Sequence, residues 1–122
     1  MLSNVDQNEP QRLGEAAVGR ASAFGDPERP VQIFGRRSCF FTLQALALVR
    51  RAGLEHDYVE LGGPEGFGLL QKLKVETRHY TVPFVFVRGR FVGGFDDLEQ
   101  LHHDGGLAAL AAPAPRDSVI RR

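Results

Sequence analysis

The chain has one cysteine, no tryptophan and no excess of either charge among its 122 residues. One cysteine excludes an internal disulfide, so no disulfide framework stabilises this fold. Lysine plus arginine and aspartate plus glutamate number 15 each, which gives no reason to expect nucleic acid or a membrane as partner. No apolar run is long enough to span a bilayer, and residues 1–7 lack the pattern of a signal peptide. These absences favour a reducing compartment, and we expect a cytoplasmic protein.

The composition changes twice along the chain. Residues 1–29 are polar, hold several glycines and prolines and have no strong apolar stripe, which predicts a disordered N-terminal extension. Residues 113–122 begin with alternating proline and alanine, which predicts a disordered tail for the same reason. One folded domain is therefore expected over residues 30–112, a length adequate for a single core.

Apolar periodicity within this domain predicts alternating strands and helices. Strands are predicted at 31–34, 56–61, 83–87 and 91–93, with a tight turn at 88–90. Helices are predicted at 40–52, 66–79, about 96–102 and 106–111. The strand–helix–strand order implies parallel pairing, and the tight turn implies an antiparallel hairpin. The expected fold is α/β: a four-stranded mixed sheet flanked by helices, in the order β-α-β-α-β-β-α.

The helices also carry packing expectations. The helix at 40–52 is apolar nearly all round, which predicts that it is buried. The helix at 66–79 is expected to turn Phe67, Leu70 and Leu73 inward. Asp96 followed by Glu99 has the spacing of a capping box at the start of the next helix.

Cys39 stands where the first strand ends and the first helix begins. Arg36 and Arg37 precede it, and cations and a helix N-terminus both stabilise a thiolate. We therefore expect a lowered pKa and a nucleophilic sulfur, although a lone cysteine is also commonly a small buried hydrophobe. Thr42 cannot resolve a mixed disulfide, so an outside thiol must do so. The Thr42 hydroxyl either hydrogen-bonds the sulfur or is an ordinary group of the first helical turn.

Two further motifs have both a structural and a functional interpretation. Thr81-Val82-Pro83 either starts a strand or contains a cis bond that presents the Val82 backbone to a bound peptide. The glycines of Gly93-Gly94-Phe95-Asp96-Asp97 either form a bulge or allow a ligand to approach closely. The two aspartates cap a helix or bind a ligand at its N-terminus.

In order and spacing, these features together resemble the glutaredoxin family of the thioredoxin fold. The resemblance covers residues 31 to about 110. It rests on the strand ending in Phe34, on Arg36 three residues before Cys39, on Thr81-Val82-Pro83 and on Gly93-Gly94-Phe95-Asp96-Asp97-Leu98. The run Pro83-Phe84-Val85-Phe86-Val87 followed by Gly93-Gly94 is especially typical of the family. The resemblance implies a thioredoxin-like fold and a glutathione-dependent thiol–disulfide oxidoreductase.

The resemblance also implies roles for individual residues. Cys39 attacks mixed disulfides of glutathione, so glutathione is the co-substrate and glutathionylated proteins or small disulfides are the partners. Arg36 binds the glycine carboxylate of glutathione, and Val82, before a cis Pro83, pairs with its cysteine backbone. The γ-glutamyl end is bound by a backbone N–H and a carboxylate from Asp96 and Asp97. Two weaker candidates at the glycine carboxylate are His79 and Arg78, and a solvated helix end is the competing interpretation of His79.

The motif Cys39-Phe40-Phe41-Thr42 departs from the family's Cys-Pro-Tyr-Cys and makes the chain monothiol. Deglutathionylation needs one thiol only, so the expected protein is a monomeric enzyme, and bulky Phe40 bears on its level of activity. One alternative is a [2Fe–2S] module, in which Cys39 of each of two subunits and two glutathiones hold the cluster. Another is a redox-inactive scaffold that binds a partner through residues 1–29. No other metal site is expected, since adjacent His102 and His103 point to different helix faces.

Overall fold

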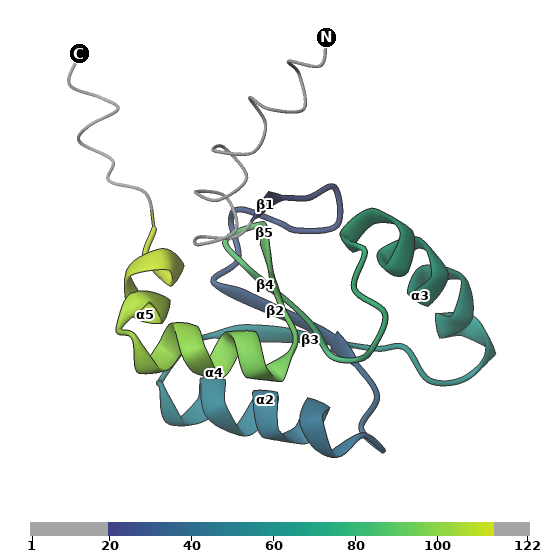
Figure 1. Cartoon of the computed structure of the whole chain (residues 1–122), viewed down its shortest axis with the longest axis horizontal. Coiled ribbons are helices and arrows are strands. Elements are labelled where there is room, and N and C mark those ends of the chain that lie inside the picture. Colours follow the sequence, from purple (N-terminus) through teal and green to yellow (C-terminus); the bar gives the residue numbers. More distant parts are fainter. Residues whose placement is uncertain (1–19, 114–122) are drawn as a thin grey trace, which may run out of the picture.

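A mixed β-sheet forms the centre of the structure, a computed structural model that describes residues 20–113. Its strands are β1 (Arg20–Ala21), β2 (Val31–Gly35), β3 (His56–Glu60), β4 (Phe84–Val87) and β5 (Arg90–Gly93). They lie in the order β1-β5-β4-β2-β3 (Figure 1). The strands β2 and β3 pair in parallel, whereas β4 pairs antiparallel with both β2 and β5. The four predicted strands form the expected thioredoxin-like sheet, and β1 adds a short antiparallel edge next to β5.

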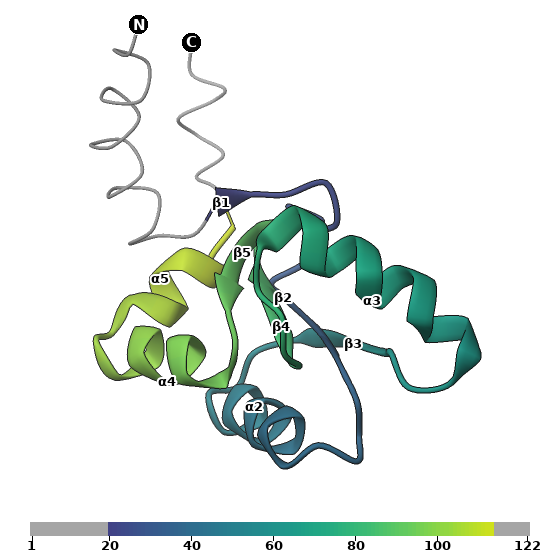
Figure 2. The same cartoon turned by 45° about the vertical axis from the view of Figure 1, so that its right-hand side comes forward.

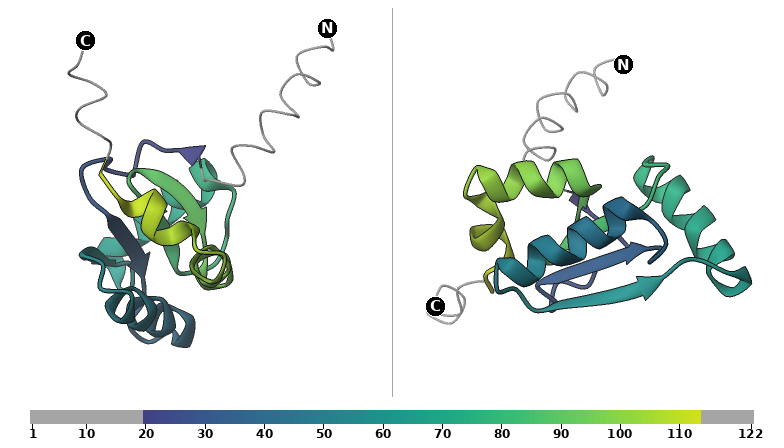
Figure 3. Two further views of the ribbon diagram at one scale, coloured as in Figure 1. Left: turned by 90° about the vertical axis from the view of Figure 1, so that its left-hand side faces the viewer. Right: turned by 90° about the horizontal axis from the view of Figure 1, so that it is seen from below.

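Four helices cover the two faces of this sheet. They are α2 (Phe40–Arg51), α3 (Pro64–Thr77), α4 (Phe95–His103) and α5 (Gly106–Ala111). Figure 2 shows α3 alone on one side, with α2, α4 and α5 on the other, and Figure 3 shows α2 running beside α4. Proline at the first position of α3 suits a helix start, because the missing N–H would have no acceptor there. Within residues 20–113, no helix has both the length and the apolar character to span a membrane.

Side-chain alternation along the strands divides the core in two. The larger cluster lies between the sheet and α2, α4 and α5, and its strand residues are Val31, Ile33, Val85 and Val87. The smaller cluster lies under α3, and its strand residues are Phe34, Phe84 and Phe86. Every residue of β4 is buried, which fits the continuous apolar run predicted for that strand.

Two packing expectations are wrong. The helix α2 is not buried on every side, because Phe40 is 64% exposed and Phe41 is 51% exposed. Phe67 of α3 is 60% exposed rather than turned inward. The buried face of α3 instead begins at Gly66, where an added Cβ would clash with the carbonyl of Leu61. The helix approaches the chain so closely there that only glycine fits, and Phe67 lies on the adjacent, open side.

The expected disorder of the N-terminal extension is wrong for residues 20–29. After β1, the Ser22 hydroxyl and the Ala23 N–H both donate to Oε2 of Glu76 on α3, at 2.8 and 2.9 Å. These are polar contacts to a residue far along the chain, so an apolar stripe in the segment itself could not reveal them. Residues 1–19 and the predicted tail from residue 114 onward lie outside the described part of the chain.

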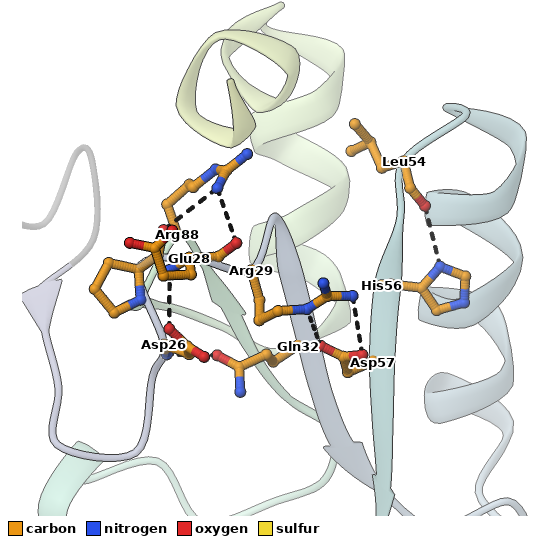
Figure 4. Close-up of polar contacts among 9 residues, drawn as sticks. Asp26, Glu28, Arg29, Gln32, Leu54, His56, Asp57 and Arg88 are labelled. Carbon is orange, nitrogen blue, oxygen red and sulfur yellow. Dashed lines mark hydrogen bonds and ion pairs between the residues drawn. The ribbon is translucent and has the colours of Figure 1, made fainter. Parts of the chain in front are cut away.

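Two arginines join elements at the end of the sheet where β2 begins (Figure 4). Arg88 donates from Nε to the carbonyl of Ala111 at 2.7 Å and from its guanidinium to the carbonyl of Glu28 at 3.1 Å. Arg29 forms a 2.6 Å ion pair with Asp57 of β3. These contacts tie together the N-terminal segment, the β4–β5 turn, the end of α5 and β3. The opposite end of β2 leads to Cys39.

Candidate functional site

Cys39 is the N-cap residue of α2. Its backbone is extended, with φ −97° and ψ 126°, and its N–H donates to the carbonyl of Arg36 at 2.9 Å. Its own carbonyl accepts the N–H of Leu43 at 3.1 Å. The thiol is free and half-buried. Because the first N–H groups of a helix have no acceptor within the helix, this position brings unpaired donors close to the sulfur.

The surroundings lower the pKa of the Cys39 thiol below its ordinary value. Partial burial has the largest single effect and raises the pKa. The N–H groups of Thr42 and Phe41, the Thr42 hydroxyl and the charge of exposed Arg36 all lower it, and together they outweigh burial. This is the electrostatic setting that the sequence predicted for Cys39, and its catalytic role stays a prediction.

Thr42 connects the loop before Cys39 to α2. The side chain is fully buried, and Oγ1 accepts the backbone N–H of Arg36 at 3.3 Å. An added Cβ on Gly35 would lie 2.5 Å from the same oxygen, so β2 ends tightly against Thr42. Since Oγ1 is the acceptor in this bond, its proton can point to the sulfur. The Thr42 hydroxyl is also one of the groups that lower the pKa of Cys39.

A cavity of about 200 Å³ lies beside the first turn of α2. It is lined by Phe41, His79, Thr81, Val82, Pro83, Gly94, Phe95, Asp96 and Asp97. Four predicted site residues therefore meet around one space, and the bond between Val82 and Pro83 is cis. Cys39 and Arg36 are not part of the lining. Cys39 is close to it along the chain, because the lining residue Phe41 follows Cys39 by two residues.

The N-terminus of α4 forms one wall of this cavity. Its N-cap is Gly94, whose N–H donates to Oδ2 of Asp97 at 3.1 Å. The predicted capping pair of Asp96 and Glu99 is therefore wrong, because a glycine N-cap leaves no side-chain signal in the sequence. Asp96 and Asp97 are both exposed, and it is the Asp97 carboxylate that caps the helix. The N–H groups of the first turn are available to an anion.

His79 does not occupy the solvated helix end considered for it. Its ring packs edge-on against Phe84 and Phe91, with centroids 5.1 and 5.5 Å away. It lines the cavity, and its Nε2 is buried without a hydrogen-bond partner among the described residues. Its neighbour Arg78 is exposed and ends α3 in a left-handed conformation with φ 59°. His79 thus contributes to the cavity wall, a role that no local sequence signal indicated.

Aromatic rings form a row that the sequence reasoning did not foresee. Phe40 packs edge-on against Phe41 with centroids 5.6 Å apart, and Phe41 stacks on Phe95 at 6.2 Å. The row leads from the residue after Cys39 to the cavity. The only signal in the sequence was the adjacent pair Phe40-Phe41. Two exposed aromatic rings are unusual at the start of a helix. Within residues 20–113, no three histidine, cysteine or acidic side chains gather in a way that could hold a metal ion.

Comparison with known proteins shows the family to which this chain is related. The family model described as Glutaredoxin matches residues 31–92. The chloroplastic monothiol glutaredoxin-S12 of Arabidopsis thaliana is 38% identical over 89 residues, which cover 71% of this chain and 50% of that protein. Glutaredoxin-1 of Rhizophagus irregularis is 33% identical over 84 residues, which cover 68% of this chain and 83% of that protein. The chain spans about half the length of several curated relatives that it matches.

Solved structures give the same result. A buckwheat glutaredoxin in complex with glutathione superposes with a TM-score of 0.66 at 27% identity, over 70% of this chain and 78% of that one. A wheat glutaredoxin superposes with a TM-score of 0.64 at 32% identity, over 70% and 84% of the two chains. The family model, the curated relatives and the fold agree, and this chain belongs to the glutaredoxin family.

Proposed function

We propose that this protein is a glutathione-dependent thiol–disulfide oxidoreductase that removes glutathione from mixed disulfides by a monothiol mechanism. One observation carries the proposal. A single thiol of lowered pKa lies at a helix N-terminus, next to a cavity lined by Val82, Asp96 and Asp97. The substrates are glutathionylated proteins or small disulfides, and a monomer suffices. A cytoplasmic location suits a reaction that consumes glutathione.

The reaction proceeds through two exchanges at sulfur. The Cys39 thiolate attacks the glutathione sulfur of the mixed disulfide, whose S–S bond breaks. The substrate sulfur leaves as a thiolate and takes up a proton. Cys39 is then joined to glutathione, and the thiolate of a second glutathione attacks the glutathione sulfur of this disulfide. Oxidised glutathione leaves, and the Cys39 thiolate is restored.

The described residues fit the two ends of glutathione. The free N–H groups at the start of α4 suit the carboxylate of the γ-glutamyl end, and the exposed Asp96 carboxylate suits its ammonium group. Asp97 contributes its N–H rather than its carboxylate, which caps the helix. The Val82 backbone suits the central peptide unit, and the guanidinium of Arg36 suits the glycine carboxylate.

The test is a turnover assay with the mixed disulfide of glutathione and cysteine. Glutathione, glutathione reductase and NADPH complete the assay, and NADPH loss reports the oxidised glutathione formed. We expect turnover in the wild type and none in Cys39→Ser, which cannot form the intermediate. Wild type without turnover would overturn the proposal.

The same preparations test the cluster alternative. Each chain has one thiol, so a [2Fe–2S] cluster would require a second chain and two glutathiones. We would incubate the protein anaerobically with iron, sulfide and glutathione and record visible absorption and molecular mass. A dimer with a cluster band that Cys39→Ser lacks, in a protein without turnover, would favour the cluster module. A protein that shows no cluster band and no turnover would favour the scaffold.

A further inference from the structure

Arg36 and Arg37 are adjacent in sequence but differ in their surroundings. The guanidinium of Arg37 lies over the ring of Tyr58, 4.3 Å from its centroid. Its backbone N–H donates to Oε1 of Glu60 at 3.0 Å. The Arg36 side chain is exposed, and its guanidinium forms no hydrogen bond or ion pair within residues 20–113. One arginine is therefore held against β3, and the other is available to a ligand.

Glu60 holds this arrangement through three donors. Oε1 accepts the Arg37 N–H and the Tyr58 hydroxyl, and Oε2 accepts the N–H of Gly62 at 3.0 Å. The Tyr58 hydrogen bond is the largest of the effects that lower the pKa of Glu60, and the two N–H groups act in the same direction. Glu60 is thus an ionised acceptor fixed at the end of β3, directly opposite Gly35 in the parallel register.

The three-residue loop before Cys39 is consequently held from both sides. The N–H of Arg36 donates to Thr42 on α2, and the N–H of Arg37 donates to Glu60 on β3. The carbonyl of Arg36 accepts the N–H of Cys39. These bonds fix the backbone from which both the Arg36 side chain and the thiol extend.

We propose that Glu60 is a positioning residue for glutathione recognition. Glu60 and Tyr58 hold Arg37 away from the ligand and fix the loop so that Arg36 faces the glycine carboxylate. This inference rests on the proposed function. A loop that is ordered in advance avoids the entropy loss of ordering it on binding, so Glu60 acts on substrate affinity.

The sign of the effect separates positioning from simple electrostatics. Glu60 is a negative charge near the place where an anionic ligand would bind. If charge alone mattered, Glu60→Ala would tighten binding and lower KM. If Glu60 positions the loop, Glu60→Ala raises KM about fivefold, the loss of roughly one net hydrogen bond. The change should fall on KM rather than on kcat.

Three variants complete the experiment, with the mixed disulfide of glutathione and cysteine as substrate. Glu60→Gln keeps one acceptor oxygen and should recover part of the lost affinity. Tyr58→Phe removes one of the three donors, keeps the ring beneath Arg37 and should raise KM about twofold. Asp57→Asn is the matched control, because it loses a carboxylate contact at the other end of the same strand (Figure 4) and should leave KM unchanged.

The outcomes distinguish this inference from the proposed function. Wild-type turnover combined with an unchanged or lower KM in Glu60→Ala would overturn the role of Glu60 and leave the enzyme intact. If the wild type has no turnover, calorimetry makes the same comparison. The Kd for oxidised glutathione is measured in Cys39→Ser and in the double variant Cys39→Ser with Glu60→Ala. An equal Kd in the two proteins overturns the inference. If Glu60→Ala does not fold, Glu60→Gln and Tyr58→Phe decide by the direction of their KM change.

Discussion

Replacing Thr42 with valine removes one hydroxyl from beneath the thiol. Thr42 is fully buried, accepts the Arg36 N–H at 3.3 Å and lowers the pKa of Cys39 through its hydroxyl. Valine has nearly the same shape, so the tight contact with Gly35 persists. The perturbation is therefore confined to the effect of the hydroxyl on the thiol pKa and to the hydrogen bond from the loop.

The magnitude follows from the hydrogen bond to the thiolate. A hydrogen bond to a charged group contributes about 1.5 kcal/mol, which is roughly a tenfold change in an acid dissociation constant. Thr42→Val therefore raises the pKa of Cys39. The thiolate is the reactive form, so wild-type reactivity is lost as pH falls through the lowered pKa of Cys39, and the variant loses it at higher pH. Below both midpoints, the variant should react about tenfold more slowly.

The assay is a pH titration of thiolate absorbance in the ultraviolet, with Cys39→Ser as blank, repeated as the rate of alkylation by iodoacetamide. Thr77→Val is the matched control, because Thr77 is the other buried polar residue among those described. Its hydroxyl donates to the carbonyl of Leu73 at 2.7 Å, away from the thiol. An unchanged midpoint in Thr42→Val, or an equal shift in Thr77→Val, would refute the reasoning.

Two further substitutions test the surroundings of the site. Phe40→Ser should change the free energy of unfolding by no more than about 0.5 kcal/mol, because the ring is 64% exposed. It should also raise kcat/KM for mixed disulfides, because a smaller side chain then follows Cys39, whereas Phe67→Ser should not. Gly93→Ala should cost about 2 kcal/mol in urea unfolding, because φ is +132° and the new Cβ would clash with the Asp97 carboxylate that caps α4. A Gly93→Ala protein with wild-type stability would contradict the role assigned to this cap.

The sequence predicted those parts of the fold that depend on local pattern. The continuous apolar run at 83–87 indicated a central strand, and β4 is buried throughout. The turn around Gly89, where φ is +81°, indicated the hairpin. Segment 20–29 was misjudged because bonds to Glu76, Asp57 and Gln32, residues outside the segment, order it. Contacts of that kind have no signature within the segment.

The candidate site likewise has features that the local sequence predicts and features that it does not. The position of Cys39 was predicted from a strand end, two cationic residues and a helix start, all within a few residues of one another. The cis bond at Pro83 came from the family resemblance, since residue types alone do not determine the isomer. Glu60 was missed because its contact with Arg37 depends on the register of two parallel strands, which pairs Gly35 with Glu60. Register is a property of the assembled sheet.

Thr42 shows what a chain gains when it has no second thiol. Its oxygen accepts the Arg36 N–H and its hydroxyl acts on the Cys39 sulfur, whereas a cysteine there is a weaker donor and a weaker acceptor. We therefore expect Thr42→Cys to weaken both bonds while it supplies a thiol that can compete with glutathione for the intermediate. KM for the mixed disulfide of glutathione and cysteine should rise about threefold, the loss of less than one net hydrogen bond. The pKa of Cys39 should rise as well. The kinetic assay and the thiolate titration measure these effects, with Thr77→Cys as the matched control. A Thr42→Cys protein with wild-type KM and midpoint would show that the threonine hydroxyl has no special part in the exchange.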